Sequence, residues 1–223
     1  MFPSDEMRFR AGILLVALAV VVIGLAAYQL WPDSANTEEE FTRAAEALKS
    51  VRTFRYQYAD LAGARPNRES REIICPSRQH VTIASASGDY GTFEYLFVDG
   101  RSFHRNQRFS GWREYTEFSS DHNYDPRILC DKLAADETPG PFPPFATLLK
   151  RGFATPGEIK QVESGAQCRE WTVKVPRMGL ADDSESFCLD IGSHLPLWRV
   201  TASGRYSYSD FNAPIAIERP FVP

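Results

Sequence analysis

The sequence predicts an α+β domain built on an antiparallel sheet with helices on one face, preceded by one N-terminal transmembrane helix. Many short apolar or alternating segments follow one another at hairpin-length spacing, which predicts the sheet. Helical patterns occur only before these segments and as one insert between them. A long run without charged residues at 11–31 predicts the membrane helix.

The membrane helix is predicted from length and from flanking charge. The run AGILLVALAVVVIGLAAYQLW at residues 11–31 would span about 30 Å as a helix, the thickness of a bilayer's hydrocarbon core. Arg8 and Arg10 precede it, while Asp33 and three glutamates follow it, which favours a cytoplasmic N-terminus. We therefore expect a single-pass protein of the inner or cytoplasmic membrane, with its C-terminal domain periplasmic or on the cell surface.

The length of the run favours a retained anchor, because cleaved signals have apolar regions of about 7 to 15 residues. Cleavage after Ala26 or Ala27 is the alternative, since Gly24 and Ala26 are small and suitably spaced. With a retained anchor, the chain divides into a cytoplasmic N-terminus at 1–10, the anchor at 11–31, a linker at 32–36 and one extracytoplasmic domain at 37–223.

The domain begins with an amphipathic helix at residues 37–51. Thr37 is its N-cap candidate, three glutamates follow in the expected first turn, and apolar side chains recur at helical spacing. The segment TFRYQYADL at 53–61 then alternates aromatic and polar residues, the pattern of a half-buried strand. A helix followed by a strand therefore opens the domain.

Further strands follow, and one turn between them is well marked. Asp99 and Gly100 separate the apolar segment at 92–98 from its return at 102–105, which predicts a hairpin. In the first of these strands Phe93, Tyr95 and Phe97 share one face. The other strands expected in this half are at 71–75, 80–86 and 111–118.

A helical insert near 125–152 interrupts the strands. Asp125 is the N-cap of a helix that starts at Pro126, and a second helix closes at Gly152. After the insert, strands are expected at 158–164, 167–175, 184–191, 195–203, 205–211 and 213–217.

Four cysteines, an even number, favour disulfides in a domain outside the cytoplasm. Cys168 and Cys188 lie on successive predicted strands, so we expect them to pair and to leave Cys75 with Cys130. A metal site is not predicted, because short paired spacings such as C-x-x-C are absent from the sequence.

Composition and motifs limit the classes of function that fit this sequence. The chain is 43% hydrophobic with a net charge of -4, which indicates an ordered globular body and argues against nucleic acid as a partner. The sequence has no G-x-S-x-G, no H-E-x-x-H and no glycine-rich phosphate loop. Asp121, His122 and Asp125 come nearest to a catalytic or metal-binding group, but Asp125 is better explained as a helix cap. We predict neither catalysis nor a cofactor.

Four stretches carry a resemblance to a known fold: AAEALKSVRTFRYQY, LFVDGRSFHRNQRFSGWREY, CLDIGSHLPLWRV and YSYSDFNAPIAIERP. In their order they resemble the bacterial outer-membrane lipoprotein carriers and the mycobacterial LppX/LprG-type lipoproteins, which share a LolA-like half-barrel. The resemblance implies a curved antiparallel sheet, an incomplete barrel, wrapped around helices and enclosing an apolar cavity for lipid acyl chains. This chain lacks the lipoprotein cysteine and has the membrane run in its place.

Aromatic and aliphatic side chains on the inside of such a half-barrel are the candidate ligand site, because an acyl chain needs an apolar pocket. The expected lining is Phe54, Tyr56, Tyr58, Phe93, Tyr95, Phe97, Phe145, Leu148 and Leu149. The alternative is that these residues only pack the sheet against its helices.

A second candidate is the basic hairpin that carries Arg101, Arg105 and Arg108. Guanidinium groups suit phosphate and carboxylate, so the hairpin could contact lipid headgroups or the membrane surface. The alternative is a charged hairpin that protects a sheet edge.

Together these observations predict a membrane-anchored extracytoplasmic binding protein for lipid or another apolar ligand. The expected partners are the membrane, a lipid or acyl-chain ligand and envelope proteins. An envelope protein-interaction or sensor domain of the same fold is the alternative, and a hydrolase is a third possibility.

Overall fold

The computed structural model describes residues 34–61, 67–84, 91–107, 109–115, 125–135, 141–151, 154–175 and 183–222. The chain divides into two compact units, Met1–Asn36 and Thr37–Pro223, and the second contains the sheet. The expected membrane helix at 11–31 lies outside the described residues. None of the helices in the described ranges has the length and apolar character needed to cross a membrane.

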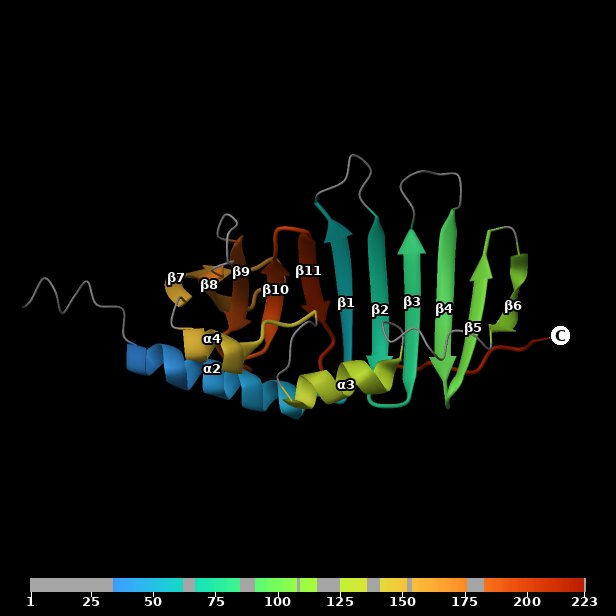
Figure 1. Ribbon diagram of the computed structural model, residues 1–223, viewed down its shortest axis with the longest axis horizontal. Helices are drawn as coiled ribbons and strands as arrows, with labels where there is room; N and C mark the ends of the chain where they lie inside the picture. Colours follow the sequence, from blue (N-terminus) through green and yellow to red (C-terminus); the bar gives the residue numbers. More distant parts are fainter. Residues whose placement is uncertain are drawn as a thin grey trace, which may run out of the picture. The chain divides into compact units, whose positions relative to one another are not determined.

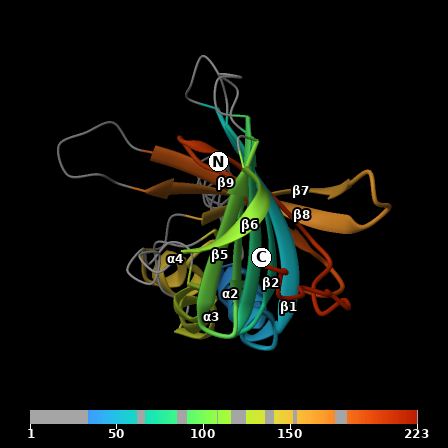
Figure 2. The same ribbon diagram turned by 90° about the vertical axis from the view of Figure 1, so that its right-hand side faces the viewer.

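The described strands form a single 11-stranded antiparallel sheet. Strands β1 to β6 follow one another as a meander, and the later strands return so that β11 pairs with β1 (Figure 1). Figure 2 shows β7 and β8 running across the direction of β1–β5, so the sheet twists strongly. The strands are β1 (Thr53–Asp60), β2 (Arg68–Ile74), β3 (Arg78–Ala84), β4 (Thr92–Val98), β5 (Arg101–Asn106), β6 (Phe109–Tyr115), β7 (Ala154–Gln161), β8 (Gln167–Val175), β9 (Asp183–Asp190), β10 (Pro196–Val200) and β11 (Gly204–Ser209).

Three helices accompany the sheet: α2 (Ser34–Lys49), α3 (Pro126–Ala135) and α4 (Phe145–Arg151). In Figure 1, α3 lies at one end of β1–β3, whereas α2 and α4 lie by β8–β11. We call the sheet face that packs against them the inner face, and the opposite face the outer face.

The prediction that Thr37 caps the first helix is wrong, because Ser34, Ala35 and Asn36 already belong to α2 and place the three glutamates beyond its first turn. Both helices of the insert are confirmed.

The core centres on Phe41 of α2, which is completely buried. Its ring centroid lies 4.7 Å from that of Trp171, 5.5 Å from Phe145 and 5.7 Å from Phe187. These contacts join α2 to α4, β8 and β9, and Phe54 and Ile73 extend the same core beneath β1 and β2. The helical spacing of apolar residues in α2 therefore covers the inner face, as its pattern predicts.

Two buried polar groups fasten the segment before α4 to the inner face. Arg199 of β10 is only 7% exposed, pairs with Glu185 at 2.8 Å and donates to the carbonyl oxygen of Phe142 at 2.8 Å. The Tyr208 hydroxyl donates to the carbonyl oxygen of Pro141. Because both donors are buried, each needs such a partner.

Both predicted disulfides are confirmed. Cys75 and Cys130 are joined with their Cα atoms 5.8 Å apart, which ties the end of β2 to α3. Cys168 and Cys188 are joined at 5.6 Å and link the neighbouring strands β8 and β9. No free cysteine remains in the chain.

The hairpin predicted at Asp99 and Gly100 is also confirmed. Both residues have positive φ, 51° and 81°, and Val98 pairs directly with Arg101. A two-residue turn with positive φ at both positions matches the twist of the strands it joins, which explains the Asp-Gly pair.

Two strand predictions need correction. The strand expected at 158–164 is β7, which starts earlier at Ala154 and ends at Gln161, because Pro156 and Gly157 are accommodated at a bulge on the sheet edge. The segment at 213–217 is not a strand. It crosses the outer face, where Ile217 packs with Leu96 and Phe103 while Arg78 donates to its carbonyl oxygen at 2.8 Å.

Candidate functional site

The half of the inner face that lies farther from the helices presents a group of hydrophobic side chains. Strand register places Tyr206, Tyr58, Ile83 and Phe93 in one row, and Tyr95 lies in the next row. All five are half-buried, whereas Phe54 and Ile73, which belong to the core on the same face, are fully buried. We call Tyr58, Ile83, Phe93, Tyr95 and Tyr206 the distal inner face, and regard it as the candidate ligand surface.

One ion pair lies among the hydrophobic residues of the inner face. Glu69 and Arg71 both point inward from β2 and bond to each other, with side chains 19% and 11% exposed. The Arg71 guanidinium also lies 5.6 Å from the ring centroid of Tyr56. Charged side chains with so little exposure are usually paired with an opposite charge. The inner face of these strands has few other carboxylates that could pair with Arg71. Glu69 pairs in register with Tyr58 on one side and with Ile83 on the other, so the ion pair lies beside two residues of the distal inner face.

Burial raises the pKa of the Tyr56 hydroxyl far above its usual range. The hydroxyl therefore stays protonated and donates to Glu69 across 3.4 Å. Tyr56 thus joins the ion pair to the core below it.

Tyr58 is fixed in place by its neighbours. Its hydroxyl donates to the carbonyl oxygen of Ser203 at 3.1 Å, and its ring centroid lies 4.7 Å from that of Tyr206. Gly204 lies directly beneath the ring, since a Cβ there would come within 2.3 Å of the ring carbon Cε2. Glycine at this position allows the Tyr58 ring to lie against the backbone of β11.

The nine residues expected to line a cavity fall into two groups in the structure. Tyr58, Phe93 and Tyr95 belong to the distal inner face. The other six lie in or against tightly packed parts of the inner face: Phe54, Tyr56, Phe97, Phe145 and Leu148 are buried, and Leu149 is half-buried against the core.

Four members of the site were missed by the sequence analysis: Ile83, Tyr206, Glu69 and Arg71. The alternation RYSYS at 205–209 could have indicated Tyr206, because it places two tyrosines on one face. Glu69 and Arg71 gave no such signal, since charged residues on a strand are normally expected to face water.

The basic hairpin is paired on the outer face. Arg101 bonds to Glu114, and Arg105 bonds to Glu94 through two contacts of 2.8 Å while its guanidinium lies 4.6 Å from the ring centroid of Trp112. Arg108 lies outside the described residues. The cations of Arg101 and Arg105 are therefore already balanced by carboxylates.

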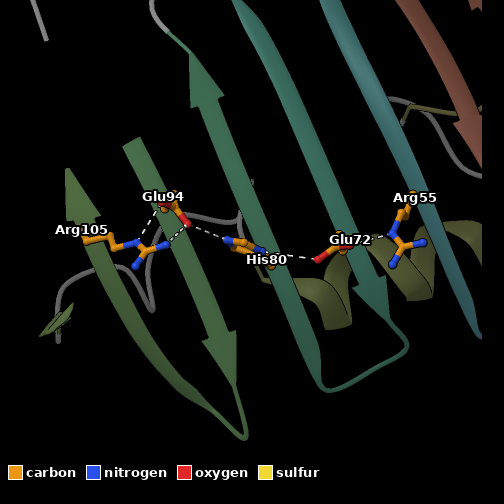
Figure 3. Close-up of polar contacts among 5 residues, drawn as sticks. All are labelled: Arg55, Glu72, His80, Glu94 and Arg105. Carbon is orange, nitrogen blue, oxygen red and sulfur yellow. Dashed lines mark hydrogen bonds and ion pairs between the residues drawn. The ribbon is translucent and has the colours of Figure 1, made fainter. Parts of the chain in front are cut away.

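Arg105 belongs to a polar ladder that crosses five strands (Figure 3). His80 lies at its centre, with Nε2 3.1 Å from Glu94 and Nδ1 3.4 Å from Glu72. Arg55 closes the far end with a 2.6 Å bond to Glu72. Alternating cations and carboxylates in neighbouring strands stabilise a sheet face, so we interpret the ladder as structural.

We expect Glu94→Gln to lower the free energy of unfolding by about 1 kcal/mol near neutral pH. Burial alone would raise the pKa of Glu94, but the hydrogen bonds from Arg105 and His80 outweigh it and lower the pKa. A carboxylate with a lowered pKa stabilises the fold above its unfolded pKa and loses that effect as the pH falls. Urea unfolding at several pH values should therefore show the deficit shrinking toward acid. The exposed Glu163→Gln is the matched control, and an equal, pH-independent deficit in both variants would contradict the prediction.

Among the described residues, no three His, Cys, Asp or Glu side chains form a group that could hold a metal ion. Asp125 accepts a hydrogen bond from the backbone N–H of Arg127 at 2.9 Å, which confirms its role as the cap of α3. Asp121 and His122 lie outside the described residues.

The open antiparallel sheet with helices on its inner face gives this chain a half-barrel fold of the LolA-like type. The solved structure of LprF from Mycobacterium bovis shares it, with a TM-score of 0.59 and 11% identity, covering 85% of this chain and 98% of LprF. At this identity the likeness concerns the fold alone. No protein-family model matches the chain, and no curated protein matches it significantly.

Two further solved structures are more distant. The MucA/MucB complex of Pseudomonas aeruginosa matches with a TM-score of 0.42 and 16% identity, covering 81% of this chain and 59% of the other. A LolA superfamily protein from Nitrosomonas europaea matches with a TM-score of 0.30 and 8% identity, covering 81% and 94%. Neither match is close enough to bear on function.

Proposed function

We propose that this chain is a non-catalytic extracytoplasmic binding protein, which holds a lipid acyl chain or another apolar ligand on the distal inner face. The observation that carries the proposal is the set of five half-buried hydrophobic residues on the inner face of the sheet. Each methylene that such a surface removes from water contributes about 0.8 kcal/mol, so a long acyl chain needs few polar contacts. The Glu69–Arg71 pair supplies one polar end for the ligand.

We further propose that the run at 11–31 is a retained anchor, which would hold the domain at the inner or cytoplasmic membrane with the C-terminal domain outside the cytoplasm. A domain so tethered would exchange lipid with one membrane. N-terminal sequencing of the mature protein tests this point, and a start near Tyr28 would contradict it.

Bound lipid is tested by mass spectrometry of organic extracts from the purified full-length protein. We expect a stoichiometric apolar ligand in the natural chain and at least a tenfold loss in Phe93→Glu, because a carboxylate would then face the acyl chain. Thr92→Glu is the matched control, since it introduces the same charge one residue away on the opposite face of β4.

Extracts without a ligand from the natural protein, or equal ligand in Phe93→Glu, would contradict the proposal. Cross-linking in cells distinguishes the alternative of an envelope protein-interaction domain. A partner captured through the inner face of a protein free of lipid would favour that alternative.

A further inference from the structure

A separate hollow lies on the outer face, where β11, β1, β2 and β3 run side by side. It is open to solvent and has a volume of about 390 Å³, within the range of small-molecule sites. Alternation along the strands directs Ala59, Gln57 and Ser70 into it, whereas Tyr58 and Glu69 point to the inner face and bond there to Ser203 and Arg71. The hollow is therefore distinct from the distal inner face.

Two arginines, Arg68 and Arg205, line this hollow from strands on either side of β1. Ala59 of β1 pairs in register with Arg68 of β2 on one side and with Arg205 of β11 on the other. Their Cα atoms are thus about two strand spacings apart, roughly 10 Å. Because Ala59 has only a methyl group, the side chain of β1 leaves space between these two positions.

The next row of the hollow supplies neutral polar groups. Gln57 pairs in register with Ser70 on one side and with Ser207 on the other. Their hydroxyl and amide groups can donate hydrogen bonds beside the two guanidinium groups. The side chains that line the outer-face hollow therefore contain several donors, and the carboxylate of Glu69 is turned away from it.

The lack of carboxylate partners for Arg68 and Arg205 contrasts with four other arginines of the outer face. Arg55, Arg78, Arg101 and Arg105 each pair with a glutamate or aspartate. Within the described part of the chain no carboxylate pairs with Arg68 or Arg205, and the Arg205 guanidinium instead lies 5.6 Å from the ring centroid of Trp198. Two cations without carboxylate partners at one hollow give it a positive potential, which favours an anionic ligand.

We propose that this hollow is a binding site for the phosphate group of a phosphate ester. A tetrahedral phosphate presents oxygen atoms in several directions, so it can accept hydrogen bonds from both guanidinium groups at once, which suits it better than a planar carboxylate. The volume exceeds that of a bare anion and leaves room for an organic substituent. The substituent belongs either to a soluble phosphate monoester or to the diester of a phospholipid headgroup.

Isothermal titration of the full-length protein with three probes tests the site. Inorganic phosphate and glycerol 3-phosphate represent soluble phosphates, and glycerophosphoglycerol represents a deacylated headgroup. We expect at least one ester to bind with a dissociation constant of about 1 mM or tighter, and glycerol not to bind. Preference for the monoester identifies a soluble ligand, and preference for the diester identifies a lipid headgroup.

Variants locate the binding. Arg68→Gln and Arg205→Gln should each weaken it by roughly tenfold or more, because each removes a charge-assisted hydrogen bond. Ala59→Glu should abolish it without unfolding the protein, since the new carboxylate would lie between the two arginines. Arg101→Gln, which removes one paired charge from the same face, should bind as the natural chain does.

The proposal is overturned if neither ester binds at about 10 mM, or if Ala59→Glu binds as tightly as the natural chain. Equal weakening by Arg101→Gln would also overturn it, because net charge would then explain the binding. Failure of the lipid extraction experiment would leave this result unaffected, since the two sites lie on opposite faces.

Discussion

Replacing Phe41 with alanine is expected to lower the free energy of unfolding by about 3–5 kcal/mol, the usual loss for a fully buried phenylalanine. Phe41 is 0% exposed and its ring contacts those of Phe145, Trp171 and Phe187. The substitution leaves a cavity where α2, α4 and the β8–β9 strands meet. Since burial of its apolar stripe holds α2 on the sheet, we expect this helix to become the least stable part of the variant.

Urea unfolding of the full-length protein, followed by near-ultraviolet circular dichroism, measures the loss. Thr42→Ala is the matched control, because Thr42 is the next residue of α2 and is exposed. We expect the control to change the stability by no more than about 0.5 kcal/mol. A loss below about 1 kcal/mol for Phe41→Ala would contradict the central place of this ring in the core.

Features that depend on local chain chemistry could be predicted from the sequence. The Asp99–Gly100 turn needs two adjacent residues that tolerate positive φ, and few dipeptides do. Asp125 and Pro126 mark the start of α3 for equally local reasons. The pairing of Cys168 with Cys188 also follows from sequence, because a short connection makes their strands neighbours in the sheet.

The segment at 213–217 shows where an alternating pattern misleads. Ala213, Ile215 and Ile217 alternate with Pro214 and other residues, as in a strand. The apolar side chains do share one side of the segment, since Ile215 and Ile217 pack with Leu96 and Phe103 on the outer face. The pattern reports an extended chain with one apolar side, and it does not report whether a neighbouring strand is available for pairing.

The candidate sites depend on contacts between distant parts of the chain. Arg68 and Arg205 come together only because β1 pairs with β2 on one side and with β11 on the other. The inward direction of Glu69 and Arg71 depends on which face of β2 meets the helices, and RESREII alternates weakly enough to fit either choice. Sequence patterns specify faces within a strand, but the sheet order decides which faces meet.

Removing the disulfide between Cys75 and Cys130, as Cys75→Ala with Cys130→Ala, is expected to cost about 4 kcal/mol of stability in the chain-entropy model. The cysteines are 55 residues apart in sequence, so the bond closes a long loop that contains β3 to β6. It also ties α3, a helix of 10 residues, to the sheet. A helix this short is marginal by itself, so its docking should suffer most.

The double variant Cys168→Ala with Cys188→Ala is the comparison. It separates the effect of loop closure on the unfolded chain from the effect of the disulfide on α3 docking. The sequence separation of 20 residues across the Cys168–Cys188 bond predicts a smaller loss, about 3 kcal/mol. This bond joins strands that remain paired along the whole β8–β9 ladder, so no element is released when it is removed. Amide hydrogen exchange should therefore become faster in α3 for the first variant alone. If α3 kept its natural protection there, packing of Leu129 and Leu133 would be sufficient to hold this helix, and the disulfide would act only on the unfolded chain.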